Sequence, residues 1–329
     1  MSSSSSTPKM GGDRLRIPPV ALAIGFAALV GAALILISGH DPLSAYAEIV
    51  KGSLSPAALP DTLNWATPLV GMTLAAAIPL RGGMVNLGGD GQLVIGGLIG
   101  ALAPLYLPGP DSFDAALAAW GEVRHGVPML ISSLLLSYPA IGVTSYLARF
   151  PLRDVSTGLP QTLMVPSDAR LYVLSGALNV GSLLIAAIAL AVVFVDRRTS
   201  AGYELRMRGK NPRFARYGGV RLGPQAARAM FASGAIAGLV GAIVVLGSQF
   251  RFIDGALITP AYTWSGLMAA LLVSGEPIGA IVAALFLAAL QTGGFAMQRE
   301  TSVPRVLTLV LQAIVILFLA MRRGLGRRT

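Results

Sequence analysis

The chain has 329 residues, of which 54% are hydrophobic and 12% are charged. Soluble domains carry about 25% charged residues, so this composition excludes a large soluble domain and indicates an integral membrane protein. The absence of cysteine excludes disulfides, thiolate metal sites and a cysteine nucleophile. The two histidines, His40 and His125, are far apart in sequence and do not suggest a pair of metal ligands.

The net charge of +10 is concentrated in three places. Basic residues precede the first apolar run, follow the last one, and are densest between Arg197 and Arg228. These places hold 16 of the 25 lysines and arginines. Cytoplasmic ends and loops of membrane proteins carry such an excess. The distribution therefore predicts that both termini and the central basic segment are cytoplasmic, and it argues against a nucleic-acid partner.

In chain order, residues 1–16 are Ser-rich and then basic, which predicts a disordered cytoplasmic tail. Residues 17–321 are expected to form one transmembrane domain, and residues 322–329 a basic cytoplasmic tail. Polar connections are expected at 40–61, 150–170 and 248–259. Apolar runs that could span a membrane lie at 17–38, 62–80, 84–107, 127–148, 171–195, 226–247 and 303–321, with shorter pieces at 262–274 and 278–290. We expect an all-α polytopic integral membrane protein with about 8–10 transmembrane helices, some of them short or broken.

Two stretches depart from regular spanning helices. Gly88, Gly89 and Gly91 make a regular helix unlikely at the start of 84–107, because each interior glycine costs about 1 kcal/mol. Residues 108–126 have an apolar core only at 113–120, less than half the length of about 20 residues that a spanning helix needs. We predict that 113–120 does not cross the bilayer as a full helix.

The short apolar core creates a problem of topology. Arg81 and Arg124 should both be cytoplasmic, which requires an even number of crossings between them. A half-helix or re-entrant segment is one solution. The other is that the region is deleted and this copy is inactive, in which case Arg124 would lie outside.

The longest polar interruption of the apolar pattern lies at 197–221. Asn211 is a good N-cap, Pro212 suits the first helical position, and Gly218 and Gly219 offer a left-handed stop. These signals predict a short, strongly basic helix, which is marginal alone in water and must rest on something. Its packing face should contain the small Ala215 and the aromatic Tyr217. A basic loop that merely obeys charge bias is the alternative.

Three blocks of sequence resemble one family. The run GYELRMRGKNPRFARYGGV, followed by SGAIAGLVGA, resembles the coupling loop of ABC importer permeases. The likeness is to permeases of nucleoside and simple-sugar importers, relatives of the ribose and branched-chain amino acid permeases. RGGMVNLGGDGQ, at 81–92, resembles the family's R-x-G-x-x-N-I-G-x-E-G-Q signature. Residues 130–162 resemble its span followed by G-P-L-R-D-x-S-x-G-L-P-Q-T.

The resemblance implies partners and site residues. In the family the short helix docks into a cleft on a cytoplasmic ATPase, which makes 197–224 a cytoplasmic coupling loop. The matching ATPase-coupling residues are Gly209, Asn211, Pro212, Ala215, Tyr217 and Gly219. The family works as two permease subunits, identical or different, with two ATPases and an extracytoplasmic substrate-binding protein at the bacterial inner membrane. The chain has no G-x-x-x-x-G-K-[ST] loop, so we expect it to bind no cofactor itself, with ATP and magnesium on the ATPase.

Asn86, Asp90 and Gln92 are the candidates for the translocation path or its gate. A carboxylate at the mouth of an apolar run is costly in lipid and should face protein, water or a basic partner. The alternative is that these residues brace a broken helix. The family has Glu where this chain has Asp90, so the side chain reaches one methylene less far. Arg81 is a possible partner of Asp90, with a lone positive-inside anchor as the alternative.

Other polar and aromatic residues in the apolar runs allow two interpretations. Glu276 could belong to a discontinuous helix at a substrate site or to a plain cytoplasmic turn. Tyr262, Trp264 and Phe252 could stack a ligand or form an interfacial belt, and Asn64, Trp65 and Asn179 could serve interhelical contacts. An ion-coupled secondary transporter, using Asp90 or Glu276, is the rival function. No catalytic or metal-binding constellation is evident, which disfavours an enzyme.

Overall fold

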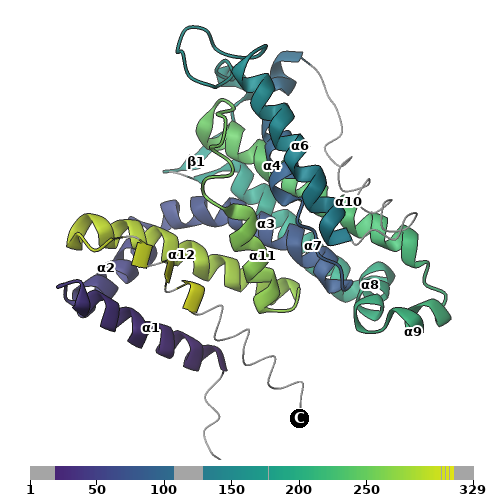
Figure 1. The fold of residues 1–329 in the computed structure, drawn as a ribbon, viewed down its shortest axis with the longest axis horizontal. Helices are drawn as coiled ribbons and strands as arrows, with labels where there is room; N and C mark the ends of the chain where they lie inside the picture. The colour runs from purple at the N-terminus through teal and green to yellow at the C-terminus, as the bar shows by residue number, and fades with distance from the viewer. Residues whose placement is uncertain are drawn as a thin grey trace, which may run out of the picture.

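The computed structural model describes residues 19–106, 129–176, 178–304, 306–307, 309–310 and 312–314. This part of the chain is helical apart from one small pair of strands (Figure 1). The predicted tails, 1–16 and 322–329, lie outside the described residues, as do the short apolar core 113–120, Arg124 and much of the predicted last span 303–321.

Long apolar helices dominate the described residues. The helices there that are long and apolar enough to cross a membrane are α3 (Leu59–Arg81), α7 (Val180–Arg198), α10 with its extension (Leu222–Gln249) and α12 (Pro277–Thr301). Shorter apolar stretches lie in α1 (Pro19–Ile37) and α4 (Gly89–Tyr106). Two further helices pack among them, α6 (Met129–Arg149) and the shorter α11 (Tyr262–Leu272). The prediction of a polytopic all-α membrane protein with short and broken pieces is confirmed.

The helix α3 lies at the centre of the fold (Figure 1) and contacts α4, α7, α10, α11 and α12. Its middle is almost entirely buried, with small residues along much of its length. The pair α4 and α10 packs closely through glycines. An added Cβ on Gly96 would overlap the backbone of Gly238, and one on Gly241 would overlap the carbonyl of Leu93. Small residues permit this approach, and van der Waals packing then holds helices together in lipid.

The start of the third apolar run, 84–107, is irregular over a shorter stretch than the sequence predicts. The backbone is non-helical only up to residue 88, and α4 begins at Gly89 and continues through Gly91. The prediction of an irregular start therefore holds for residues 84–88, which include Gly88, and is wrong for Gly89 and Gly91, which are helical. An added Cβ on Gly91 would lie 2.8 Å from the Cα of Ser137 in α6, so its absence lets α4 and α6 approach closely. Close packing offsets the low helix propensity of glycine.

Three boundaries also differ from the sequence prediction. The expected polar segment 40–61 contains the helix α2 (Pro42–Leu54), capped by Asp41 and packed against α12. The run 171–195 opens with the antiparallel strands β1 (Val173–Ser175) and β2 (Leu178–Asn179), so α7 starts only at Val180.

The short piece expected at 278–290 is in fact α12, which has 25 residues. Sequence polarity predicted an earlier end, at Gln291 and Thr292. Both side chains are buried, and the Thr292 hydroxyl donates to the carbonyl of Ala288, 3.0 Å away. This bond satisfies the hydroxyl within its own helix, so the polar residue does not end it.

The connections 150–170 and 250–261 have little regular structure, as expected, apart from the short 3-10 helix η1 (Ser167–Ala169). They lie against each other, since the amide of Thr162 donates to the carbonyl of Phe252 at 2.9 Å. Between α10 and the second connection, the chain makes a π-helical segment, η2 (Val245–Gln249).

The close α4–α10 contact gives a first prediction. Gly96→Val should lower the stability of the detergent-extracted protein by at least about 1–3 kcal/mol, because the new side chain meets backbone that cannot yield. Thermal unfolding and the monodisperse fraction on size exclusion measure the effect. Gly142→Val in α6 is the matched control, since a Cβ there meets nothing within 4 Å. Equal stability of the two variants would contradict the packing described above.

Candidate functional site

The short basic helix predicted from the sequence is present as α9 (Pro212–Tyr217). The Asn211 side chain accepts a hydrogen bond from the amide of Phe214 at 3.1 Å, and Pro212 occupies the first turn. At the other end, the amides of Gly219 and Val220 donate to the carbonyls of Arg216 and Ala215, at 3.1 and 3.0 Å. This is a Schellman ending.

Only one of the two predicted stop glycines is left-handed. Gly219 has φ +86°, whereas Gly218 has φ −76°. Gly219 therefore provides the turn, because an L-residue strains at that angle.

A second helix, α8 (Ser200–Lys210), precedes α9 and was not predicted. Its N-cap is Thr199, whose hydroxyl accepts from the amide of Gly202 at 3.3 Å. The signal for it was in the sequence, since Thr199 is a good cap and a run of strong helix formers follows. Near its end, an added Cβ on Gly209 would overlap the carbonyl of Arg81. Gly209 thus lets α8 rest directly on the end of α3.

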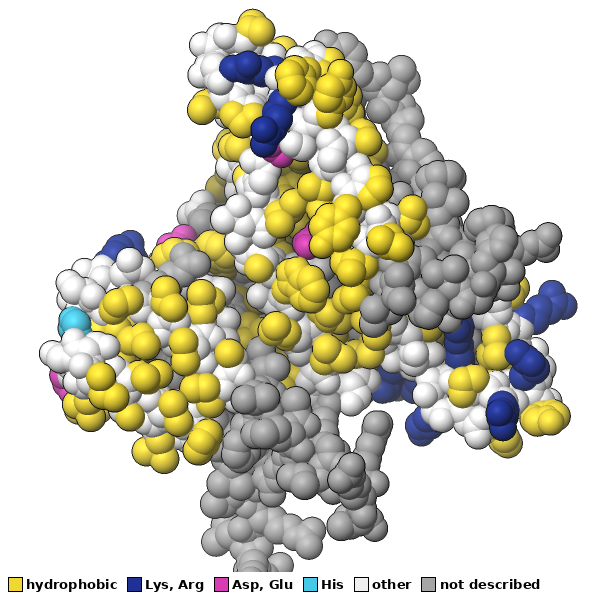
Figure 2. Space-filling model, viewed as in Figure 1, with side chains coloured by type: hydrophobic (Ala, Val, Ile, Leu, Met, Phe, Trp, Pro, Cys, Tyr) yellow, Lys and Arg dark blue, Asp and Glu magenta, His cyan; other side chains and the backbone are white. Residues whose placement is uncertain are grey.

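The residues expected to form the packing face of α9 lie on different sides of it. Ala215 is fully buried within the chain, whereas Tyr217 is 92% exposed. The prediction that they share one face is wrong. The two residues are two positions apart in the sequence, and each position turns the helix by about 100°, so their side chains point about 200° apart. Phe214 is the other large exposed hydrophobic side chain of α9, and Arg213 and Arg216 are exposed beside it. Figure 2 shows lysines and arginines gathered over α8 and α9.

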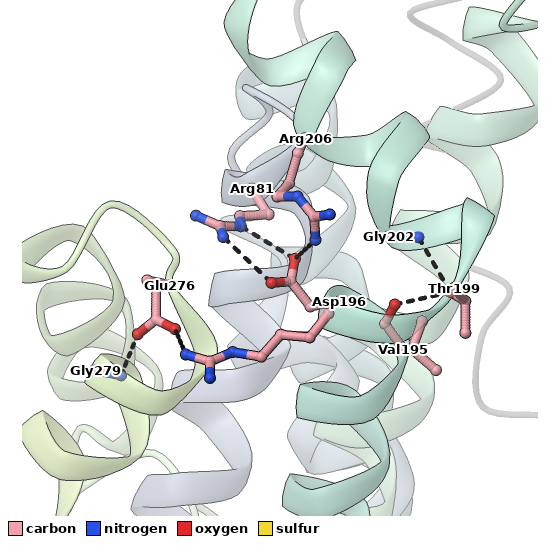
Figure 3. A network of polar contacts seen from close by, with 9 residues as sticks. Arg81, Val195, Asp196, Thr199, Gly202, Arg206, Glu276 and Gly279 are labelled. Atoms are coloured by element: carbon pink, nitrogen blue, oxygen red, sulfur yellow. Dashed lines mark hydrogen bonds and ion pairs between the residues drawn. The ribbon is translucent and has the colours of Figure 1, made fainter.

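An ion network fastens this region to the spanning helices (Figure 3). Asp196, near the end of α7, is buried and accepts from Arg81 of α3, with Nε–Oδ1 at 3.1 Å and Nη2–Oδ2 at 3.2 Å. Arg206 of α8 lies 3.4 Å from the same carboxylate. The partner of Arg81 is therefore Asp196, and both interpretations weighed from the sequence, a pair with Asp90 and a lone anchor, are wrong.

Glu276 lies in the turn between α11 and α12 and joins the same end of the molecule (Figure 3). One carboxylate oxygen is 3.1 Å from Nη2 of Arg197, and the other accepts from the amide of Gly279 at 2.5 Å. Burial acts to raise the pKa of Glu276, but these hydrogen bonds outweigh it and the pKa lies below its ordinary value. Its stabilising contribution is therefore complete above the ordinary pKa of 4.5 and is lost as the pH falls through the lowered value.

Asn86 and Gln92 belong to a buried hydrogen-bonded cluster. The Asn86 amide nitrogen donates to Gln92 Oε1 at 3.0 Å and to the Ser233 hydroxyl at 2.8 Å. Ser233 in turn donates to the carbonyl of Ala75, at 2.6 Å. That carbonyl is available because Pro79, four residues later, has no N–H to bond it. The cluster thus ties α3, α4 and α10 together.

The arrangement of this cluster favours a bracing role for Asn86 and Gln92. Asp90 is half-buried, and its Oδ1 has no hydrogen-bond partner among the described residues. The role of Asn86, Asp90 and Gln92 in a translocation path or gate stays a prediction.

The ion network gives a second prediction. Asp196→Asn keeps the shape of the side chain but removes the charge that two arginines share. We expect the free energy of unfolding to fall by about 1–3 kcal/mol, measured by thermal unfolding of the purified protein. Glu48→Gln is the matched control, because Glu48 pairs with Lys51, which is 69% exposed, in a surface ion pair of small worth. Similar shifts in both variants would contradict a structural role for Asp196.

Comparison with known proteins identifies the chain's relatives. Over 92% of its length, the chain is 31% identical to the glucose ABC transporter permease protein TsgB13 of Haloferax volcanii, of which the match covers 86%. It is 29% identical to the guanosine ABC transporter permease protein NupP of Bacillus subtilis, over 94% of the chain and 93% of the relative. It is 26% identical to the nucleoside ABC transporter permease protein NupB of Lactococcus lactis, over 94% and 91%.

Residues 113–320, more than half of the chain, match the family described as branched-chain amino acid transport system / permease component. This agrees with the resemblance seen in the three sequence blocks. The chain belongs to this family and is a permease subunit of an ABC transporter.

Proposed function

We propose that the chain forms half of the membrane path of an ATP-driven importer for nucleosides or simple sugars. The observation that carries the proposal is that α9 exposes aromatic side chains on one side and is attached to the spanning helices on the other. Its Phe214 and Tyr217 side chains are exposed, while α8 and Asp196 fasten it to α3 and α7. A partner that grips α9 would therefore act directly on the spanning helices. The substrate class rests on the relatives, which are named for glucose, guanosine and nucleosides.

The proposed partners are two ATPase subunits, a second permease subunit that is identical or different, and an extracytoplasmic substrate-binding protein. ATP and magnesium belong to the ATPase, and this chain binds no cofactor. When ATP closes the ATPase dimer, α9 moves with it, and the network at Asp196 passes the movement to α3.

The rival function, ion-coupled transport, has less support. Each of the relatives above is named as an ABC transporter permease. One of its two candidate coupling carboxylates, Glu276, is paired with Arg197 beside the α8–α9 region and caps α12.

The proposed orientation places α8 and α9 in the cytoplasm and the connection 150–170 outside, at the opposite end of α10. Because the natural chain has no cysteine, single cysteines report sidedness cleanly. In intact cells, a membrane-impermeant thiol reagent should label Val155→Cys, whose native side chain is 90% exposed. It should label Arg213→Cys only after the cells are opened. Labelling of Arg213→Cys in intact cells would reverse the orientation.

The exposed face of α9 gives a prediction about coupling. Tyr217→Ala and Phe214→Ala should each reduce ATP-driven uptake by about tenfold, because exposed aromatic anchors tend to dominate protein interfaces. Co-purification of the ATPase should fall in parallel, while the thermal stability of the permease stays unchanged. Tyr203→Ala on α8 is the control, as this tyrosine is 56% exposed but lies outside α9.

Ala215→Glu, a natural choice from the sequence alone, is a poorer test. It would place a charge in a fully buried site and disturb the packing of α9 as well as docking. Full ATPase binding and uptake by both aromatic variants would remove the main support for the proposed coupling.

A further inference from the structure

An aromatic cluster lies near the end of α3 opposite to Arg81. Trp65 precedes Arg81 by 16 residues, or about 24 Å along the helix axis. Its ring centroid is 5.8 Å from that of Tyr262 on α11 and 5.6 Å from that of Phe295 on α12, with tilted planes in both pairs. Three rings from three helices thus meet at this end of the core.

Two hollows meet at Trp65 and Asn64. The smaller, of about 180 Å³, is lined from α3, β2, α10, η2 and α11 and reaches Asn179, Ser248 and Tyr262. The larger, of about 780 Å³, is lined from α3 and α12, with Phe295 and Arg299 among its residues. The larger hollow falls within the range of about 300–1,000 Å³ that is usual for small-molecule sites. The Trp65 ring forms part of the wall of both.

The smaller hollow contains a buried amide with unused bonding capacity. Asn179 is 3% exposed, and its Nδ2 donates to the carbonyl of Gly247 at 3.2 Å. Its Oδ1 has no hydrogen-bond partner among the described residues. A buried polar atom without a partner costs about 1–3 kcal/mol, so it requires an explanation, and a bound polar molecule would supply one.

The backbone around the hollows is irregular as well. The π-helical segment η2 carries Ser248 to the wall, and such segments are frequent at functional sites. Ala261, directly before Tyr262, has φ +56°, an angle that L-residues rarely adopt. In α3, Pro68 lines the smaller hollow and leaves the carbonyl of Asn64 without its helical donor. A left-handed residue and a carbonyl that lacks its helical donor therefore lie at the same space as the unpartnered Oδ1 of Asn179.

We propose that these hollows bind an uncharged nucleoside, with its base stacked on Trp65 and its polar edge against Asn64 and Asn179. Aromatic side chains stack on the face of any base, and an amide offers a donor and an acceptor side by side, which matches a base edge. None of the residues that line the smaller hollow is charged, which suits a neutral ligand. Asp61 and Arg299 in the larger hollow can bond the sugar hydroxyls. The inference rests on the proposed function for its role in transport.

The fluorescence of Trp65 can report whether a ligand occupies the hollows, because the chain has only three tryptophans and the other two can be replaced. The double variant Trp120→Phe/Trp264→Phe, assembled with its ATPase and reconstituted in lipid nanodiscs, is titrated with guanosine, adenosine and uridine, and separately with glucose. We expect saturable quenching of Trp65 fluorescence by at least one nucleoside and none by glucose. Asn179→Ala and Asn64→Ala in this background should each weaken the apparent affinity by about fivefold or more. Trp65→Phe/Trp120→Phe, which leaves Trp264 alone, is the control that should show no saturable quenching.

ATP-driven uptake separates this inference from the proposed function, and it is measured in proteoliposomes that contain the permease variant, its ATPase, the second permease subunit and the substrate-binding protein. For the nucleoside that quenches Trp65, we expect Trp65→Leu to raise the KM of uptake by about tenfold while ATPase co-purification is unchanged. Uptake of nucleosides without any saturable response at Trp65 would overturn the site and leave the importer. Saturable quenching without ATP-driven uptake of any solute would support the site and overturn the importer. A response to glucose alone would overturn the assignment to nucleosides.

Discussion

The packing of α3 is the constraint on which the rest of the structure depends. This helix contacts α4, α7, α10, α11 and α12, and it contains two interior prolines, Pro68 and Pro79. Each proline removes a helical hydrogen bond and frees the carbonyl four residues before it. In a membrane interior such a group must be satisfied by the protein, since water is absent. The hydroxyl of Ser233 in α10 donates to the carbonyl of Ala75. The helical hydrogen bond that Pro79 removes is thus replaced by one that joins α3 to α10.

The two prolines lie near the two regions of α3 to which we assign roles in the proposed coupling and in the proposed nucleoside site. Pro79 lies two residues before Arg81, where Asp196 binds α3 to α7 and α8. Pro68 lies three residues after Trp65, in the wall of the smaller hollow. Between them, every residue from 69 to 77 is buried. In the proposed coupling, a displacement at the Arg81 end would be transmitted along this tightly packed part of α3 to the region of Trp65.

Local signals in the sequence predicted much of the fold and part of the site. The cap at Asn211, the proline after it and the left-handed Gly219 act within a few residues, so α9 could be placed from the sequence alone. Contacts between residues that are far apart in the sequence could not be predicted. The bond from Arg81 to Asp196 spans 115 positions, and Arg81 has nothing in its local sequence that names this partner. The burial of Ala215 likewise depends on packing that the spacing of residues in α9 does not specify. The continuation of α12 past Gln291 was missed because polarity was equated with exposure.

The contacts between the helices differ in how much free energy it costs to break them. The α4–α10 contact is backbone against backbone at Gly96 and Gly241, so sliding there produces overlap. The Arg197–Glu276 pair has side chains 53% and 33% exposed, and pairs of that kind contribute about 0–1 kcal/mol. It is the weaker attachment, and it holds the first residues of α12. The far end of α12 carries Phe295, part of the wall of the larger hollow. The least costly response to a pull on α9 is thus to break the Arg197–Glu276 pair, which frees the first turn of α12, the helix that carries Phe295, while the backbone contacts of α4 and α10 stay intact.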